Sequence, residues 1–191
     1  MGTPSIKNNN EGEIKNKEKE YYDKNFSDDN KSNIKREQIY INKPEPKFQI
    51  KMLEYHNIYR KRHNSKEINL TKELSDMASK YAEKLLEHNS DFEQNNFYKN
   101  QILGENILFS EKRETEEDIC NSWYDEKKNY DYSKNNFQKD TNHFTQLIWN
   151  STTHVGFGCY NIGKNYCYVA LYYPQGNILG KFTENVSKAK Q

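Results

Sequence analysis

The most informative run of this chain reads Asn142-His143-Phe144-Thr145-Gln146-Leu147-Ile148-Trp149-Asn150-Ser151-Thr152. Within it, Phe144 and Ile148 are four residues apart, and so are His143 and Leu147. A helix gives each of these pairs a common side, so the run predicts a short helix with one apolar face.

Three residues just before or at the start of this run are suitable helix caps: Asp140, Thr141 and Asn142. His143 is therefore expected at the positive end of a helix dipole. That position disfavours the imidazolium and favours the neutral ring, which is the form that binds a metal or accepts a proton. A hydrogen-bonded structural histidine is the alternative interpretation.

Apolar residues are spread unevenly along the 191 residues, of which 33% are hydrophobic and 30% charged. Residues 1–46 are rich in Lys, Glu and Asn and lack a sustained periodicity, which predicts a disordered arm. We expect one folded domain over residues 47–183 and a flexible tail over residues 184–191.

Charge and hydropathy narrow the classes of partner. A net charge of +1 gives no indication of nucleic-acid binding, and no apolar run is long enough for a membrane span. Because the N-terminus also lacks the apolar core of a signal peptide, the expected location is the cytoplasm or, peripherally, a membrane surface. An extracellular protein is the alternative.

Periodicity predicts three longer helices. The first covers about residues 48–63, with Met52, His56 and Tyr59 on one face. Thr71 is a suitable cap for the second, which is the clearest amphipathic helix of the chain. The third is expected to begin near Thr115, in a capping box with Asp118.

The third helix brings a carboxylate to an apolar face. Ile119, Trp123 and Glu126 recur at helical spacing, so Glu126 points toward the core side. A carboxylate in that position needs a histidine, an arginine, a donor network or a metal as its partner.

The last third of the chain predicts strands. Residues 89–103 are expected to form a loop, and residues 154–160 and 166–173 a hairpin around a turn at 161–165. Cys159 and Cys167 are then candidates to face each other across the hairpin, with Cys120 left over. Reduced, partly buried thiols are the other interpretation.

Motifs along the chain resemble those of the CAP superfamily, which covers cysteine-rich secretory proteins, antigen 5 and plant pathogenesis-related proteins of class 1. One signature corresponds to residues 143–152 and a second to residues 172–178. The other matching motifs, in chain order, are His56-Asn57 with Arg60, Gly104-Glu105-Asn106-Ile107, Trp123-Tyr124-Asp125-Glu126 and Val155-Gly156-Phe157-Gly158. The few cysteines and the pattern from Trp123 to Tyr130 are similar to the Golgi-associated, intracellular branch.

The resemblance implies an α+β fold, a three-layer α-β-α sandwich with a central antiparallel sheet. It also implies a cleft lined by His88, Glu105, Glu126 and His143, which are the residues that match the family's pattern. Two imidazoles and two carboxylates suit a divalent cation such as Zn²⁺, bound at neutral pH and weakened below about pH 6. We do not expect the fold to require the metal, and a metal-free polar network is the alternative.

The family resemblance favours a non-catalytic binding protein whose partner is a lipid, a sterol, another protein or a second copy of the chain. A metal-dependent hydrolase or protease that uses the same cleft is the competing interpretation. The sequence contains no His-Glu-x-x-His run and no Ser or Cys in a recognisable nucleophile motif.

Overall fold

The computed structural model describes residues 46–87 and 97–190. The helices are α2 (Pro46–Arg62), α3 (Lys72–Glu87), α4 (Glu116–Tyr124), α5 (Asn142–Ile148) and α6 (Phe182–Asn185), and a 3-10 turn, η2 (Asp125–Asn129), directly follows α4. The strands are β1 (Asn69–Leu70), β2 (Phe97–Tyr98), β3 (Gln101–Ile102), β4 (Gly104–Ser110), β5 (His154–Ile162) and β6 (Asn165–Tyr173). The expected arm, except for Pro46, and His88 lie outside the described residues.

The main sheet has the strand order β1-β5-β6-β4. β6 pairs antiparallel with β5, which confirms the predicted hairpin, and also antiparallel with β4. The two residues of β1 pair in parallel with the start of β5, at His154 and Val155. This short parallel edge is an addition to the expected antiparallel sheet.

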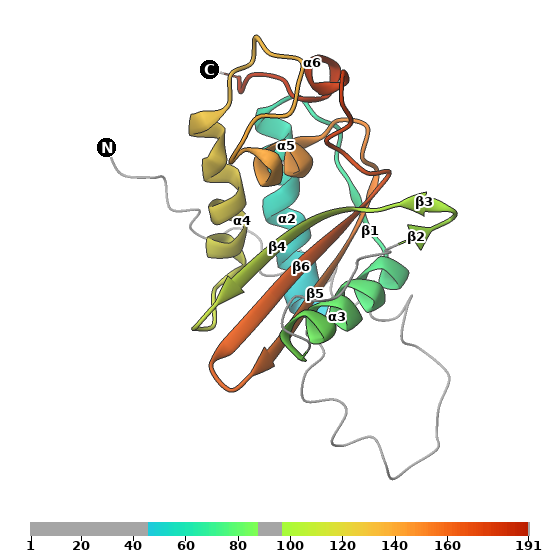
Figure 1. Ribbon diagram of the computed structural model, residues 1–191, viewed down its shortest axis with the longest axis vertical. Helices are drawn as coiled ribbons and strands as arrows, with labels where there is room; N and C mark the ends of the chain where they lie inside the picture. The colour runs from blue at the N-terminus through green and yellow to red at the C-terminus, as the bar shows by residue number, and fades with distance from the viewer. Residues whose placement is uncertain (1–45, 88–96, 191) are drawn as a thin grey trace, which may run out of the picture.

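Helices cover both faces of the sheet, which gives the three layers that the sequence predicts (Figure 1). The larger core, between the sheet and the layer of α2, α4 and α5, contains Trp123, Phe144 and Tyr172. The smaller core, under α3, contains Leu74 and Leu171. Adjacent residues of β6 point into different cores because side chains alternate along a strand.

This alternation separates the two cysteines of the hairpin. Cys159 packs against the larger core and lies opposite Tyr168, whereas Cys167 belongs to the smaller core and lies opposite Tyr160. Cys159 and Cys167 are therefore on opposite faces of the sheet, and the expectation that they face each other is wrong. All three cysteines of the chain are free.

The predicted helix starts are confirmed by their caps. The Thr71 hydroxyl accepts a hydrogen bond from the Leu74 amide at 3.3 Å, one turn into α3. Thr115 is the N-cap of α4, and its hydroxyl accepts from the Asp118 amide at 3.1 Å. Both bonds satisfy amides that a helix leaves unpaired in its first turn.

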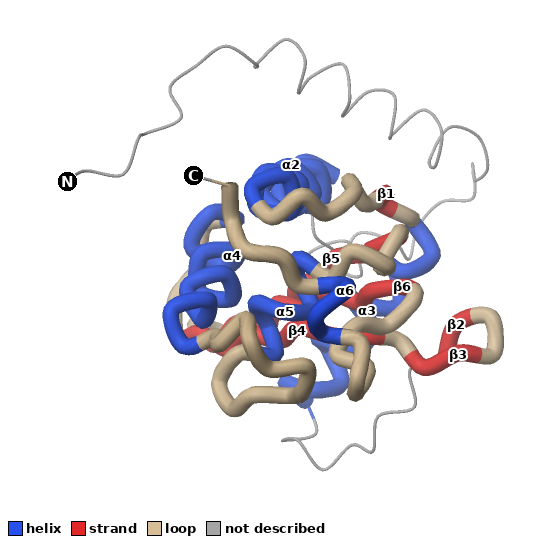
Figure 2. Tube along the Cα trace, turned by 90° about the horizontal axis from the view of Figure 1, so that it is seen from above, coloured by secondary structure: helices blue, strands red, loops and turns tan. Residues whose placement is uncertain are grey.

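Part of the expected loop over residues 89–103 is a hairpin instead. β2 and β3 pair antiparallel around Lys99 and Asn100, whose φ angles of 48° and 61° are both left-handed. Two-residue hairpin turns of this kind usually carry Asn-Gly or Asp-Gly, so Lys-Asn gave only a weak signal. The hairpin projects from the body of the molecule (Figure 2).

Two further boundaries differ from the expectation. The turn between β5 and β6 contains only Gly163 and Lys164, because Ile162 already pairs with Asn165. At the C-terminus, Asn185 and Val186 are buried and belong to the end of α6 and its junction. Among the described residues, no helix combines the length and apolar character that crossing a bilayer requires.

Candidate functional site

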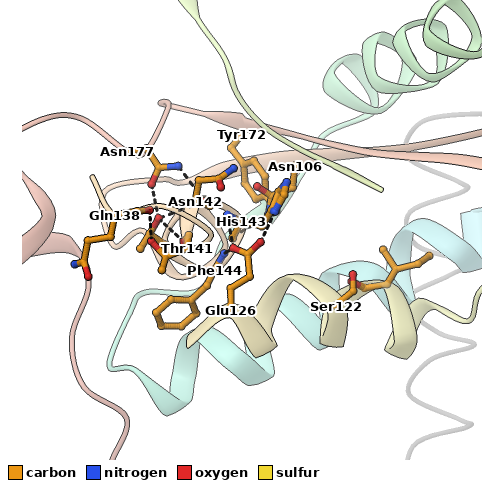
Figure 3. A network of polar contacts seen from close by, with 12 residues as sticks. Asn106, Ser122, Glu126, Gln138, Thr141, Asn142, His143, Phe144, Tyr172 and Asn177 are labelled. Carbon is orange, nitrogen blue, oxygen red and sulfur yellow. Dashed lines mark hydrogen bonds and ion pairs between the residues drawn. The ribbon is translucent and has the colours of Figure 1, made fainter. Parts of the chain in front are cut away.

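Glu126 and His143 form a direct pair at the junction of η2 and α5 (Figure 3). The Glu126 Oε1 atom accepts a hydrogen bond from the Nδ1 atom of His143 at 2.6 Å. The third predicted helix, α4, thus ends at Tyr124, and Glu126 lies in η2. Its side chain still points inward and is paired with another residue. The partner is a histidine, one of the options that the sequence left open.

The same carboxylate caps helix α5. Its Oε2 atom accepts from the backbone amides of His143 and Phe144 at 2.9 and 3.1 Å. Thr141 occupies the N-cap position but makes no side-chain capping bond. Thr141 is thus the N-cap residue, one of the three that the sequence offered, but a carboxylate from another segment satisfies the amides of the first turn.

These bonds also set the charge of Glu126. Burial acts to raise the pKa of the carboxyl, but the hydrogen bonds from His143 and Phe144 outweigh it and lower the pKa below its ordinary value. With the ionised carboxylate as acceptor, Nδ1 of His143 carries a proton, and in the neutral ring Nε2 then carries the lone pair. The side chain of His143 is 30% exposed, and Nε2 has no hydrogen bond to a described residue.

Glu105 lies on β4 and receives a hydrogen bond from the hydroxyl of Tyr81 in α3. Its Oε2 atom is buried and has no hydrogen-bond partner among the described residues. Burial raises the pKa of Glu105 to about 7, while the Tyr81 bond and the nearby charge of His143 act in the opposite direction. The carboxyl therefore titrates near neutral pH, as carboxyls in functional sites often do.

Of the four residues predicted for the site, His88 lies outside the described residues. The structure joins Glu126 to His143 directly and brings Glu105 close enough to interact electrostatically with His143. Within residues 46–87 and 97–190, no three or more His, Cys, Asp or Glu residues are arranged to hold a metal ion. The four-residue metal site stays a prediction.

A buried network of hydrogen bonds connects α5 to β4, β6 and α2. The sequence did not indicate that these residues belong to the site. Asn106 donates from Nδ2 to the carbonyl of His143 at 3.0 Å and to the hydroxyl of Tyr172 at 3.1 Å. The Tyr172 hydroxyl lies 2.8 Å from Nε2 of His56, whose Nδ1 donates to the carbonyl of Met52 at 2.8 Å. The position of Asn106 directly after Glu105 was the available signal.

The tautomer of His56 follows from these partners. A carbonyl only accepts, so Nδ1 carries the proton and Nε2 accepts from Tyr172. Burial lowers the pKa of His56 to about 3, which keeps the ring neutral. The ring is fully buried, on the helix face that it shares with Met52 and Tyr59.

Arg60 holds the other end of α5. Its guanidinium is fully buried and donates to the carbonyls of Leu147, Trp149 and Thr152 at 3.0, 2.9 and 3.0 Å. A cation at a helix C-terminus interacts favourably with the helix dipole. Glu126 and Arg60 therefore stabilise opposite ends of the helix that carries His143.

The three layers and the position of α5 define a small α-β-α domain, and comparison with known proteins identifies its family. The family model described as CAP, the cysteine-rich secretory protein family, matches residues 53–173. The chain belongs to this family.

Two relatives show how far the similarity extends. The human Golgi-associated plant pathogenesis-related protein 1 is 30% identical over 152 residues, which cover 75% of this chain and 95% of that protein. A probable pathogenesis-related protein of Candida albicans is 31% identical over 146 residues, covering 71% of this chain and 64% of its own length.

Solved structures show the same fold. Schistosoma mansoni venom allergen-like protein 4 has a TM-score of 0.57 and 23% identity, and the match covers 75% of this chain and 96% of that one. NaASP2, in a crystal structure with Zn²⁺, has a TM-score of 0.53 and 19% identity, and the match covers 74% and 85%.

Proposed function

We propose that this CAP-domain protein is a non-catalytic binding protein whose His/Glu cleft holds a divalent cation and whose surface binds a lipid, a sterol or a protein partner. The observation that carries the metal part is the orientation of His143. Glu126 holds a proton on Nδ1, so the neutral ring presents the lone pair of Nε2 in a partly exposed position. Histidines that ligate metals are typically held by a carboxylate in this manner.

The buried Oε2 atom of Glu105 supports the same proposal. It is an oxygen acceptor without a hydrogen bond to a described residue, on a carboxyl that lies near His143. An imidazole nitrogen and a carboxylate oxygen are a donor set that suits Zn²⁺. His88 would supply a further nitrogen, and the crystal structure of the relative NaASP2 with Zn²⁺ is consistent with this choice of metal.

Titration calorimetry with Zn²⁺ tests the metal site. We expect binding to the wild-type protein, a large loss in His143→Ala and in His88→Ala, and weaker binding as the pH falls below about 6. His154→Ala is the matched control, because His154 lies on β5 and bonds only Thr153 among the described side chains. Equal heats from the wild type and His143→Ala would exclude the metal site.

The apolar part of the proposal concerns the β2–β3 hairpin. Phe97 and Ile102 are paired across it and are 53% and 55% exposed, so the hairpin presents a contiguous apolar pair to solvent. Projecting apolar pairs of this kind suit a lipid, a sterol or an apolar partner surface.

Binding of radiolabelled cholesterol and of a fatty acid tests this surface. Phe97→Ser with Ile102→Ser is expected to reduce retention. The matched control is Phe109→Ser with Ile162→Ser, which removes apolar side chains that are 54% and 47% exposed on other strands. The same retention by both double variants would remove the hairpin from the proposal, and native mass spectrometry of protein from its own cells would identify the natural ligand.

A metal-dependent hydrolase is the second candidate, because Glu126 and His143 form the carboxylate–imidazole pair that general-base catalysis uses. The thiols argue against a cysteine nucleophile, since burial raises the pKa of Cys159 and Cys167 to about 12 and that of Cys120 well above its ordinary value. Turnover of peptide or ester substrates that disappears in Glu126→Gln would establish the hydrolase in place of the binding protein.

A further inference from the structure

Six exposed cations gather at one end of the molecule, where α2 ends, η2 begins its turn and the C-terminal segment passes. We call this surface the basic end; it consists of Lys61, Arg62, Lys127, Lys128, Lys188 and Lys190. The chain as a whole carries a net charge of only +1, so the basic end is a local concentration of charge and not a consequence of composition.

Hydrogen bonds hold the three segments together. The Lys190 amide donates to the carbonyl of Arg62 at 2.8 Å, and Nδ1 of His63 donates to the carbonyl of Ser187 at 2.6 Å. The other ring nitrogen of His63 lies 3.0 Å from the hydroxyl of Tyr124, just before η2. Figure 2 shows the C-terminal segment passing between α2 and α4. The cations are thus placed by the fold and not only by the flexibility of their side chains.

The six cations have no ion-pair partner in the part of the chain that the structure describes. The nearby acids are largely engaged elsewhere: Asp131 pairs with Lys134 at 3.5 Å and Glu184 with Lys181 at 3.4 Å. Asp125 is exposed and is the acid left beside the two lysines of η2. The basic end therefore keeps a clear excess of positive charge.

Aromatic rings lie beneath three of these cations and are buried or half-buried. The Arg62 guanidinium lies 5.1 Å from the centre of the Tyr59 ring, and the Lys127 ammonium 4.2 Å from that of Tyr124. Tyr59 and Tyr124 are only 4% and 3% exposed. Tyr132, whose ring centre lies 6.0 Å from the Lys188 ammonium, is half-buried. Proteins that bind single-stranded nucleic acid stack bases on exposed rings, and none of these three rings is exposed.

We propose that the basic end docks the protein on an anionic lipid surface. The charges come from three separate segments that hydrogen bonds hold side by side, so they suit a partner that presents many phosphates over an area. Lys and Arg near such a surface add up in their contribution to binding, and the interaction is screened by salt. Docking here also fixes the orientation of the domain, because Glu126 of the His/Glu pair directly precedes Lys127 in η2.

Vesicle co-sedimentation of the full chain tests the proposal, with vesicles of phosphatidylcholine alone and of phosphatidylcholine mixed with phosphatidylserine. The test variant is Lys61→Gln with Lys128→Gln, because neither side chain contacts an aromatic ring or an acid in the described structure. The matched control is Lys80→Gln with Lys164→Gln, which removes the same charge from exposed positions on α3 and on the β5–β6 turn.

We expect the wild type to bind only the vesicles that contain phosphatidylserine, with binding that weakens as salt is added. The test variant should bind about thirtyfold more weakly, since two surface charges are removed, and the control variant should match the wild type. His143→Ala should also bind like the wild type, so a failure of the metal proposal would leave this result unchanged.

Three results would overturn the proposal: no binding to phosphatidylserine vesicles, equal binding by the test variant and the wild type, or an equal loss in the test and control variants. Retention of the wild type on heparin or on double-stranded RNA without vesicle binding would instead assign the basic end to a soluble polyanion. Circular dichroism of each variant confirms that the fold is retained.

Discussion

Glu126 binds His143 at two points, through the imidazole Nδ1 at 2.6 Å and through the backbone amide at 2.9 Å. One carboxylate thus caps helix α5 and also holds a proton on Nδ1 of the histidine in its first turn. Because the same bonds serve the fold and the site, a change at Glu126 is expected to alter stability and metal binding together.

Glu126→Gln should lower the free energy of unfolding at neutral pH by about 1–2 kcal/mol, because the helix N-terminus loses its negative partner. The pKa of Glu126 is lowered from 4.5, so this stabilisation is complete above that pH and is lost as the pH falls through the folded-state pKa. Urea denaturation at several pH values measures it, with Glu111→Gln as an exposed control. A difference between the wild type and Glu126→Gln that stays constant down to pH 3 would show that the charge is not its cause.

Glu105→Gln should have the opposite pH dependence. The pKa of Glu105 rises from 4.5 to about 7 on folding, so between these pH values the folded state keeps a proton that the unfolded state releases. The free energy of unfolding of the wild type therefore falls as the pH rises through this window. Gln stays neutral, so the variant should be more stable than the wild type above pH 7 by about 1–3 kcal/mol and similar to it near pH 4.5.

The measurement is urea denaturation in the presence of a chelator, so that bound metal does not contribute. Glu83→Gln, on the exposed side of α3, is the control and should follow the wild type at each pH. Parallel stability curves for the wild type and Glu105→Gln would contradict the raised pKa of Glu105.

Arg60→Lys should be severely destabilising although the charge is kept. The guanidinium of Arg60 donates to four carbonyls, of Lys66, Leu147, Trp149 and Thr152. An ammonium cannot reach all of them from one point, so buried carbonyls lose their donors and the expected cost is about 2–4 kcal/mol. Thermal and urea unfolding measure this cost against Arg113→Lys, an exposed position where a change within about 0.5 kcal/mol is expected. A loss of unfolding free energy no larger than that of the control would show that the four hydrogen bonds of the guanidinium are not required for stability.

The sequence predicted the elements of this fold where local chemistry is strong. Thr71 and Thr115 mark helix starts because their hydroxyls cap the next turn, and both capping bonds are present. The alternation along residues 166–173 predicted the two faces of β6 because one face packs under each helical layer. Lys99 and Asn100 adopt left-handed angles without a glycine, so the β2–β3 hairpin had no comparable signal.

The site was predictable only in part, because its geometry depends on contacts between distant segments. Helical spacing indicated that Glu126 turns inward, but not that it caps α5, since the choice between a local cap and a carboxylate from η2 is made by packing. Asn106 was visible as part of a motif, yet its bonds to His143 and Tyr172 join β4, α5 and β6. Such a network has no periodicity that a sequence pattern can reveal.

Gly158→Ala should prevent α3 from packing on the sheet. A Cβ atom at Gly158 would lie 2.2 Å from the backbone nitrogen of Ser79 and 2.3 Å from the backbone carbon of Ala78. A helix backbone cannot yield as the end of a side chain can, so we expect a loss of about 3 kcal/mol or more, or failure to fold. Gly163→Ala is the control, because its Cβ meets open space and its φ of 60° costs about 1 kcal/mol. Urea unfolding compares the two variants, and equal stability would mean that α3 and β5 do not approach each other at backbone contact.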